Sequence, residues 1–293
     1  MGQQTAVATT FTHTTGARVA ASLARVDAEL ARRYPGDAGT RQPVHTVYVP
    51  ADALAPDTVR AWGDGALAAL DEHAPDARSF AGILGIPAPL AGPVHDRVRA
   101  KLRREPVEDL RIDFEDGYGP RPDAEEDAAA ARAARFVAGA CERGTAPPYV
   151  GIRMKCLEAA VRDRGIRTLD VFLTGLMDAG GLPEGLVLTL PKVTYAEQVT
   201  AMAGLAAEFE EARGLAPGRI RFEIQIETTQ AVLGPDGRAT VARMIDAGGG
   251  RVTALHYGTF DYSAACGISA AHQAPDHPAA DHAKAVMQVA AAG

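Results

Sequence analysis

The sequence predicts an α/β fold of the (β/α) barrel type. From residue 110 to the last residue, short β-rich runs alternate with helical stretches, which is typical of parallel strands joined by helical crossovers. Three of the strands also carry charged residues on one face. A barrel interior accommodates such faces, whereas the strands of an open sheet covered by helices on both sides should be apolar throughout.

The first part of the chain predicts helices around one short strand. A helical stretch from about Ala17 to Arg33 ends at the turn cluster "YPGDAG". The run "HTVYVP", residues 45–50, reads as the first strand and stops at its proline. Two further helical stretches cover Asp57 to about His73 and roughly Val94 to Arg104. We therefore expect an N-terminal helical extension over residues 1–43, followed by a barrel domain over residues 44–293.

Five more strands follow, each with a helix after it. The expected strands are 110–115, 149–155, 185–193, 219–228 and 251–258. The expected helices are 123–144, a stretch within 168–179, one opened by a capping box of Thr194 and Glu197, 239–247 and 278–293. Six strands fit both a doubly wound sheet and a barrel, so the charge pattern has to decide between them.

Charged side chains share a face in three strands because of the two-residue strand period. They are Arg111, Asp113 and Glu115 in "LRIDFE", Arg153 and Lys155 in "GIRMK", and Glu223, Gln225 and Glu227 in "RFEIQIET". Opposite charges can pair inside a barrel, and the last residues can meet a substrate at its mouth. The alternative, an antiparallel strand with one wet face, is disfavoured by the helices between the strands. We predict that these faces line a barrel interior, with Glu227 nearest the mouth.

Composition narrows the class of protein. The chain has 293 residues, of which 47% are hydrophobic and 23% charged, as in ordinary globular proteins. A net charge of -7 argues against a nucleic-acid-binding face. Cys141, Cys156 and Cys266 are widely spaced, which predicts neither a disulfide framework nor a zinc site and fits a reducing cytosol. Without an apolar signal segment or membrane span, we expect a soluble, cytoplasmic protein that does not bind membranes.

Functional residues of barrels collect at the carboxyl ends of the strands and in the loops that follow. The charged residues found there are Asp113, Glu115, Asp116, Arg153, Lys155, Lys192, Glu227 and Asp261. Several carboxylates without thiol or imidazole partners suit a hard divalent cation such as Mg²⁺, which prefers oxygen ligands. Water positions on such an ion can be exchanged for the carboxylate and keto oxygens of a substrate.

Each of these residues has a structural alternative. An acid at a strand end is often a helix N-cap or a surface salt-bridge partner. Asp116 precedes Gly117 in a turn and could serve that turn alone, and Arg153 could simply pair with an acid inside the barrel. His256 has the inward parity of a ligand, yet a single histidine in a strand is more often a hydrogen-bonded core residue.

Six sequence blocks together resemble a known superfamily. They are "VYVPAD", "IDFEDG", "GIRMK", "LPKV", "IQIETTQAV" and "YGTFDYSAACG". Their order is similar to that of the citrate lyase beta subunit, HpcH/HpaI aldolase and malate synthase superfamily, over residues 44–293. Any one block is weakly specific, whereas six in order are strongly so. "DFED" and "FDYS" look nearer to malate synthase, and the chain length looks nearer to the citrate lyase type.

The resemblance implies an activity and a set of site residues. It implies a barrel that makes or breaks a carbon–carbon bond of a 2-oxo acid through an enolate, often with an acyl-CoA thioester. Glu227 and Asp261 match the magnesium ligands, and Arg153 matches an arginine that contacts the oxo acid or enolate oxygen. Glu115 and Asp116 match an acidic pair near the waters of the metal. A cation and a guanidinium are suited to stabilise the charge that develops on an enolate oxygen.

The matching blocks contain further candidates for substrate binding. Lys192, Gly258 and Thr259 are expected to line the substrate site together with Arg153. The superfamily barrel has eight strands, so the last two βα units would be missing from this chain. An exposed hydrophobic seam beside the first and sixth strands would then favour self-association. The resemblance itself implies a homo-oligomer, a trimer or a hexamer.

Two other functions stay open at this point. A barrel lysine with a lowered pKa can act as a Schiff-base nucleophile, and Lys192 or Lys155 could do so in an aldolase of that type. The chain could also be a non-catalytic barrel subunit. In either enzyme, no residue stands out from the sequence as the catalytic acid or base.

Overall fold

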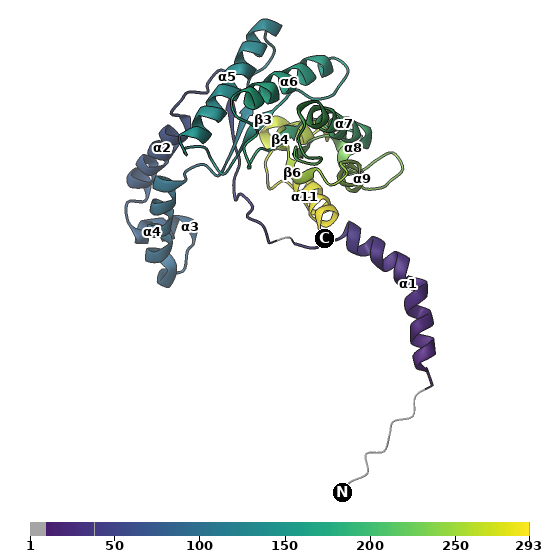
Figure 1. Cartoon of the computed structure of the whole chain (residues 1–293). Helices are drawn as coiled ribbons and strands as arrows, with labels where there is room; N and C mark the ends of the chain where they lie inside the picture. Colours follow the sequence, from purple (N-terminus) through teal and green to yellow (C-terminus); the bar gives the residue numbers. More distant parts are fainter. Residues whose placement is uncertain (1–9, 38, 293) are drawn as a thin grey trace. The chain divides into compact units, whose positions relative to one another are not determined.

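The computed structural model describes residues 10–37 and 39–292. The chain divides into two compact units, Met1–Gln42 with Ala291–Gly293 and Pro43–Ala290. The first unit contains α1 (His13–Arg33), drawn in purple in Figure 1. This helix begins one turn before the predicted start, because the hydroxyl of Thr12 accepts the N–H of Thr15 and caps it. That residues 1–43 act as a separate extension stays a prediction.

The second unit is built on a six-stranded parallel sheet. Every strand is hydrogen-bonded to the strand that follows it in the chain, in the order β1-β2-β3-β4-β5-β6. A doubly wound sheet is excluded, because its strand order reverses at a switch point. The strands are β1 (Val47–Pro50), β2 (Asp109–Asp113), β3 (Tyr149–Arg153), β4 (Leu188–Leu190), β5 (Phe222–Ile226) and β6 (Val252–Tyr257).

The sheet is strongly curved. β1 and β6 are its two edges, and in a flat sheet they would lie about 24 Å apart at roughly 4.8 Å per strand. The hydroxyl of Tyr48 in β1 is nevertheless 2.9 Å from Nδ1 of His256 in β6. These two side chains therefore meet on the inside of the curve, which we call the inner face. Within the described residues no backbone pairing joins β6 to β1.

Helices connect the strands, as the alternation predicted (Figure 1). In the second unit they are α2 (Thr58–His73), α3 (Ala77–Leu84), α4 (Ala88–Arg104), α5 (Asp123–Glu142), α6 (Arg162–Asp178), α7 (Ala196–Arg213), α8 (Thr229–Val232), α9 (Thr240–Ala247), α10 (Thr259–Ala265) and α11 (Pro278–Ala291). A short 3-10 helix covers Ala270–His272. None of the described helices is both long enough and apolar enough to span a lipid bilayer.

Two local predictions need correction. The helix predicted from about Val94 begins earlier, at Ala88 of α4, where Pro89 loses no hydrogen bond because the first N–H groups of a helix have no partner within it. The predicted capping box of Thr194 and Glu197 is wrong by one residue. The N-cap of α7 is Tyr195, and Gln198 accepts its backbone N–H at 3.4 Å.

The core lies on both faces of the central strands. Along β5, Phe222, Ile224 and Ile226 are fully buried on the helix side, while the intervening Glu223 and Gln225 are buried on the inner face. The predicted alternation is therefore present, and its polar face is turned away from bulk water. The edge strands β1 and β6 are less buried than the strands between them.

Candidate active site

The deepest polar residues of the inner face form a fully hydrogen-bonded group. Arg111 of β2 donates to Glu223 of β5 through Nε and NH2 at 2.9 and 3.0 Å, and through NH2 to Asp109 at 3.0 Å. The hydroxyl of Thr189 in β4 also donates to Glu223. Each of these four residues is at most 2% exposed. We call Asp109, Arg111, Thr189 and Glu223 the floor cluster.

Arg153 lies above the floor cluster, at the carboxyl end of β3. Its Nε and NH2 bind the two oxygens of Asp113 at 2.7 and 2.6 Å, and NH1 donates to Gln225 at 3.2 Å. The ring of Tyr48 covers one face of the guanidinium, 4.7 Å from its carbon. These contacts use three of the five N–H groups of an arginine. Arg153 is thus paired with an acid inside the fold, which was the structural alternative to a role in the site. It still has two N–H groups that could bind a substrate.

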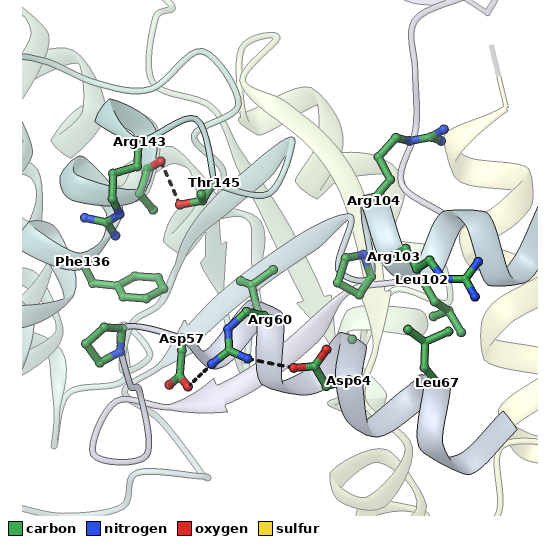
Figure 2. A pocket seen from close by; sticks show the side chains of 15 residues that line it. Asp57, Arg60, Asp64, Leu67, Leu102, Arg103, Arg104, Phe136, Arg143 and Thr145 are labelled. Atoms are coloured by element: carbon green, nitrogen blue, oxygen red, sulfur yellow. Dashed lines mark hydrogen bonds and ion pairs between the residues drawn. The ribbon is translucent and has the colours of Figure 1, made fainter. Parts of the chain in front are cut away.

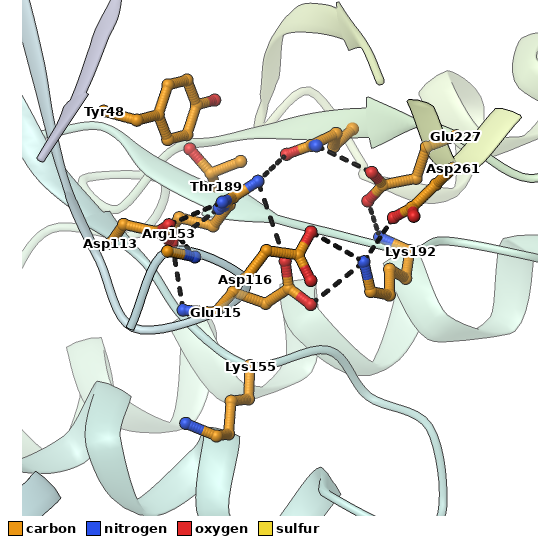
Figure 3. Close-up of polar contacts among 12 residues, drawn as sticks. Tyr48, Asp113, Glu115, Asp116, Arg153, Lys155, Thr189, Lys192, Glu227 and Asp261 are labelled. Carbon is orange, nitrogen blue, oxygen red and sulfur yellow. Dashed lines mark hydrogen bonds and ion pairs between the residues drawn. The ribbon is translucent and has the colours of Figure 1, made fainter. Parts of the chain in front are cut away.

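Acidic residues gather around Lys192 at the carboxyl ends of the strands (Figure 3). Nζ of Lys192 lies 3.1 Å from Glu115, 3.0 Å from Asp116 and 2.5 Å from Asp261. Glu227 accepts the backbone N–H of Lys192 at 2.7 Å. The structure therefore brings together five of the predicted site residues, from the loops after β2, β4 and β5 and from α10. We call Glu115, Asp116, Lys192, Glu227 and Asp261 the mouth cluster.

The mouth cluster has too little positive charge. Burial raises the pKa of Glu115 and of Glu227, each to about 7, and Lys192 offsets only part of that effect. Burial alone would lower the pKa of Lys192, but its hydrogen bond to Asp261 and the surrounding acids raise it. Oε2 of Glu115 is buried and has no hydrogen-bond partner among the described residues. The ammonium of Lys192 thus contacts three carboxyl groups while its backbone N–H binds a fourth, and the nearest further cation, Arg153, is 3.7 Å from Oε2 of Glu115.

The acids of the mouth cluster fit a hard divalent cation. Oxygen atoms of Asp116, Glu227 and Asp261 all lie within 4.8 Å of one another. Carboxylate oxygens are the ligands that Mg²⁺ prefers, and the buried Oε2 of Glu115, which accepts no hydrogen bond from the described residues, lies in the same cluster. Asp116, which could have served its turn alone, is therefore a third candidate ligand beside Glu227 and Asp261, the two residues that match magnesium ligands in the resemblance.

The backbone at Lys192 is unusual. With φ at 50° it is the one non-glycine residue with positive φ in the described part of the chain. This left-handed conformation turns its N–H toward Glu227 while its side chain reaches the other acids. Strained backbone of this kind persists where the surroundings hold it in place, and it concentrates at functional sites.

Gly258 and Thr259, the remaining candidates for substrate binding, lie beside the mouth cluster. A Cβ at Gly258 would be 2.5 Å from the Cβ of Glu227, so the close approach of these two segments of the chain requires glycine. Thr259 begins α10, two residues before Asp261, which the same helix carries to the cluster. Their contact with a substrate stays a prediction.

The expectation that Lys155 shares the inner face with Arg153 is wrong. β3 ends at Arg153, so the two-residue period no longer applies to Lys155. Its Nζ lies 2.7 Å from Glu126 of α5 and donates to the carbonyl of Phe114 at 2.8 Å. Figure 3 shows the side chain pointing away from the mouth cluster.

A cavity of about 480 Å³ lies elsewhere, between α2, the end of α4 and the end of α5 (Figure 2). Arg60 within it is paired with Asp57 and Asp64, both at 2.9 Å. Its lining includes none of the residues of the mouth cluster. The chemistry therefore points to the carboxyl ends of the strands and not to this cavity.

The sequence alone does not single out Tyr48, and it favours a core role for His256. Tyr48 stands in an apolar run, "VYV", where nothing distinguishes a packing tyrosine from a functional one. The inward parity of His256 is the one signal in the sequence. Its partner Glu223 comes from β5, which precedes β6 in the chain, but its partner Tyr48 comes from β1, 208 residues away.

Fold and site together define a class: an α/β protein with a curved, parallel six-stranded sheet and an acid-rich site at the carboxyl ends of its strands. The chain belongs to the family described as "Domain of unknown function (DUF6986)", which matches residues 23–293. A search of the curated proteins gives no match.

Solved structures give partial likenesses. One is a citrate lyase from Burkholderia xenovorans LB400, with 22% identity and a TM-score of 0.49, covering 67% of this chain and 56% of that chain. Another is a malate synthase from Haloferax volcanii in a lead(II) complex, with 17% identity and a TM-score of 0.49, covering 63% and 50%. Its magnesium/glyoxylate complex has the same identity and score, covering 63% and 52%. The chain spans about half the length of these structures.

Proposed function

We propose that this protein is a magnesium-dependent carbon–carbon lyase or aldolase that acts on a 2-oxo acid or a hydroxy-acyl substrate through an enolate. The observation that carries the proposal is the mouth cluster, in which four carboxyl groups share Lys192 beside Arg153. A site short of positive charge suits a divalent cation and an anionic substrate bound to it. The six sequence blocks support the same class of reaction.

Each residue has a role in this proposal. Glu227, Asp261 and Asp116 would hold the ion, which when bound stabilises negative charge on an enolate oxygen. The two N–H groups that Arg153 has left would grip a carboxylate or the enolate oxygen in its plane. Glu115, whose pKa burial raises to about 7, can hold a proton near the substrate at neutral pH.

Three further parts of the proposal do not rest on a contact between described residues. Gly258 and Thr259 would line the substrate together with Lys192. A CoA thioester would be the acyl form of the substrate. The chain would work as a homo-oligomer in the cytoplasm, without nucleic acid or membrane partners.

A Schiff-base mechanism has less support. It needs an amine whose pKa is lowered, so that the free base is present at neutral pH. The pKa of Lys192 is raised by Asp261 and the other acids, and Nζ of Lys155 is held by Glu126 and a backbone carbonyl. A non-catalytic subunit would need no surplus of acids at its mouth.

Enolate formation can be tested before the full substrate is known. With pyruvate in D2O, the protein should exchange the methyl protons in a Mg²⁺-dependent way, followed by proton NMR. Glu227→Ala and Asp261→Ala should abolish the exchange, whereas Glu211→Ala, an exposed acid on α7, should leave it unchanged. A panel of 2-oxo acids and acyl-CoA thioesters, with and without Mg²⁺, then finds the substrate.

Two results would count against the proposal. One is the absence of both Mg²⁺ binding by calorimetry and proton exchange with every 2-oxo acid in the panel. The other is a Lys192 adduct trapped by borohydride in the presence of substrate, which would establish the Schiff-base mechanism instead.

A further inference from the structure

A chain of hydrogen bonds crosses the inner face below Arg153 and outside the mouth cluster. The hydroxyl of Tyr48 is 2.9 Å from Nδ1 of His256, and Nε2 of His256 is 3.0 Å from Oε2 of Glu223. The three groups come from β1, β6 and β5. A hydroxyl, an imidazole and a carboxylate thus stand in line, which is the arrangement that lets an imidazole take a proton from a hydroxyl while a carboxylate orients it.

The partners determine where the hydrogen atoms lie. Burial would raise the pKa of Glu223, but the hydrogen bond from His256 and the charge of Arg111 outweigh it and hold the pKa at about 2. An ionised Glu223 can only accept, so Nε2 of His256 carries its proton. In the neutral ring Nδ1 then accepts from Tyr48, whose own pKa is raised by burial and by the charge of Glu223.

Tyr48 is also next to the group that would hold the substrate. The guanidinium carbon of Arg153 lies 4.7 Å from the centre of the Tyr48 ring. The side chain of His256 is 22% exposed, so this part of the inner face is open to solvent and not sealed in the core. The other charged groups that face these three side chains are Arg111 and Asp109 on β2.

We propose that Tyr48, His256 and Glu223 are the proton relay of this site; the inference rests on the proposed function. In the direction of cleavage, the substrate hydroxyl gives its proton to Oη of Tyr48 while Tyr48 gives its own proton to Nδ1 of His256. The carbon–carbon bond breaks, the hydroxyl carbon becomes a carbonyl, and the electron pair of the bond forms the enolate. Reversal of the relay returns the proton to the enolate carbon and restores the starting state.

The relay explains why three residues are needed. Tyr48 stays neutral throughout, because it gains one proton as it loses another. The positive charge appears on His256, beside the carboxylate of Glu223, which is in turn held by Arg111 at 2.9 and 3.0 Å. A buried carboxylate next to a forming imidazolium lowers the free energy of the charged state.

The first experiment needs no substrate. Nitrogen-15 NMR of the histidine rings should show His256 as the neutral form protonated on Nε2, with its signals assigned by their loss in His256→Gln. Tyr48→Phe keeps the ring over Arg153 but removes the hydroxyl, so the Nδ1 signal should shift. Tyr257→Phe is the matched control, because its hydroxyl has no hydrogen-bond partner in the described residues. Protonation on Nδ1, or an unshifted signal in Tyr48→Phe, would overturn the relay.

The second experiment measures the reaction. Tyr48→Phe and His256→Gln should each slow the Mg²⁺-dependent exchange of pyruvate protons by about 100-fold or more, while Mg²⁺ binding by calorimetry stays as in the parent. Tyr257→Phe should exchange at the parent rate. If Tyr48→Phe also exchanges at the parent rate, the relay is overturned and the proposed function stands. If the parent exchanges no 2-oxo acid at all, the proposed function fails and the relay fails with it.

Discussion

Glu223 lies on β5, and Glu227 follows directly after the last residue of that strand, on the same face. Both residues are 2% exposed. Their electrostatics are opposite: the pKa of Glu223 is lowered to about 2, and that of Glu227 is raised to about 7. Burial opposes ionisation at both, but Glu223 is paired with His256 and shares Arg111 with one acid, Asp109, whereas Glu227 shares Lys192 with three other acids. The two glutamates are equally buried, but the acids of the floor cluster are paired with a cation, whereas the mouth cluster has more acids than cations. The surplus of charge, and not burial, distinguishes the candidate site.

The largest expected effect comes from breaking the floor cluster. Arg111→Leu should destabilise the protein by about 3–5 kcal/mol, because it leaves the carboxylates of Asp109 and Glu223 buried without their cation. Urea unfolding of the variant and the parent measures this difference in the free energy of unfolding. Lys192→Leu at the mouth cluster is the comparison, and it should cost much less because Asp116 and Asp261 are exposed. A larger cost for Lys192→Leu would contradict the contrast between the two clusters.

Arg153 lies between the clusters, and Arg153→Lys should impair turnover more than folding. A single ammonium cannot bind both oxygens of Asp113 and still offer a planar pair of N–H groups to a substrate. We expect proton exchange with pyruvate to fall by about 100-fold, the scale measured for losing one hydrogen-bond donor to an oxyanion. Unchanged exchange in Arg153→Lys would remove this residue from the site.

Magnesium should stabilise the mouth cluster alone. At a concentration 100 times its dissociation constant, the ion should raise the free energy of unfolding by about 2.7 kcal/mol. Glu227→Ala and Asp261→Ala should each lose this response together with activity. Glu223→Ala should keep it and show instead a lower stability of folding. Calorimetry that finds magnesium binding unchanged in both the Glu227 and Asp261 variants would show that the proposed ligands are wrong.

The last expected effect is the pH dependence of stability in metal-free buffer. The pKa of Glu115 and Glu227 is about 7 in the folded protein against an ordinary 4.5, so their contribution is full below pH 4.5 and is lost as the pH rises through 7. The pKa of Glu223 is about 2, so its contribution is full above pH 4.5 and is lost as the pH falls toward 2. The mouth acids therefore lower stability as the pH rises, whereas Glu223 lowers stability as the pH falls.

Urea unfolding at pH 5 and pH 8, with a chelator present, measures the upper limb of this dependence. Glu115→Gln should flatten it, because the glutamine does not titrate. Saturating magnesium should flatten it too, because the ion replaces the protons that the acids hold. Stability that rises between pH 5 and pH 8 in the metal-free parent would mean that the mouth acids are ionised without cost.

Most strands and helices could be predicted because their signals are local. The polar and apolar residues of "RFEIQIET" alternate with the strand period whatever the rest of the chain does. Glu115, Asp116, Glu227 and Asp261 could be brought together because the carboxyl ends of parallel strands meet at one edge of a sheet. That one rule placed the acids of the mouth cluster beside one another without any knowledge of their distances.

The misses have physical reasons of another kind. Lys155 was misplaced because a period applies only while the chain stays extended, and β3 stops two residues earlier. The contact of Tyr48 with His256 depends on the curvature of a sheet whose edges are 208 residues apart in the chain. The start of α4 was missed because its prolines were taken as helix breakers, although a helix tolerates proline in its first turn.

Lys192 has a consequence for ion selectivity. Its ammonium already lies among Glu115, Asp116 and Asp261, so any ion that enters must compete with a tethered charge of +1. Sodium or potassium would bring the same charge as the group it displaces and would gain little. A divalent ion brings twice that charge to the same oxygens. In the proposed metal site, the tethered amine would therefore favour divalent ions and disfavour abundant monovalent ions by their charge and not by their size.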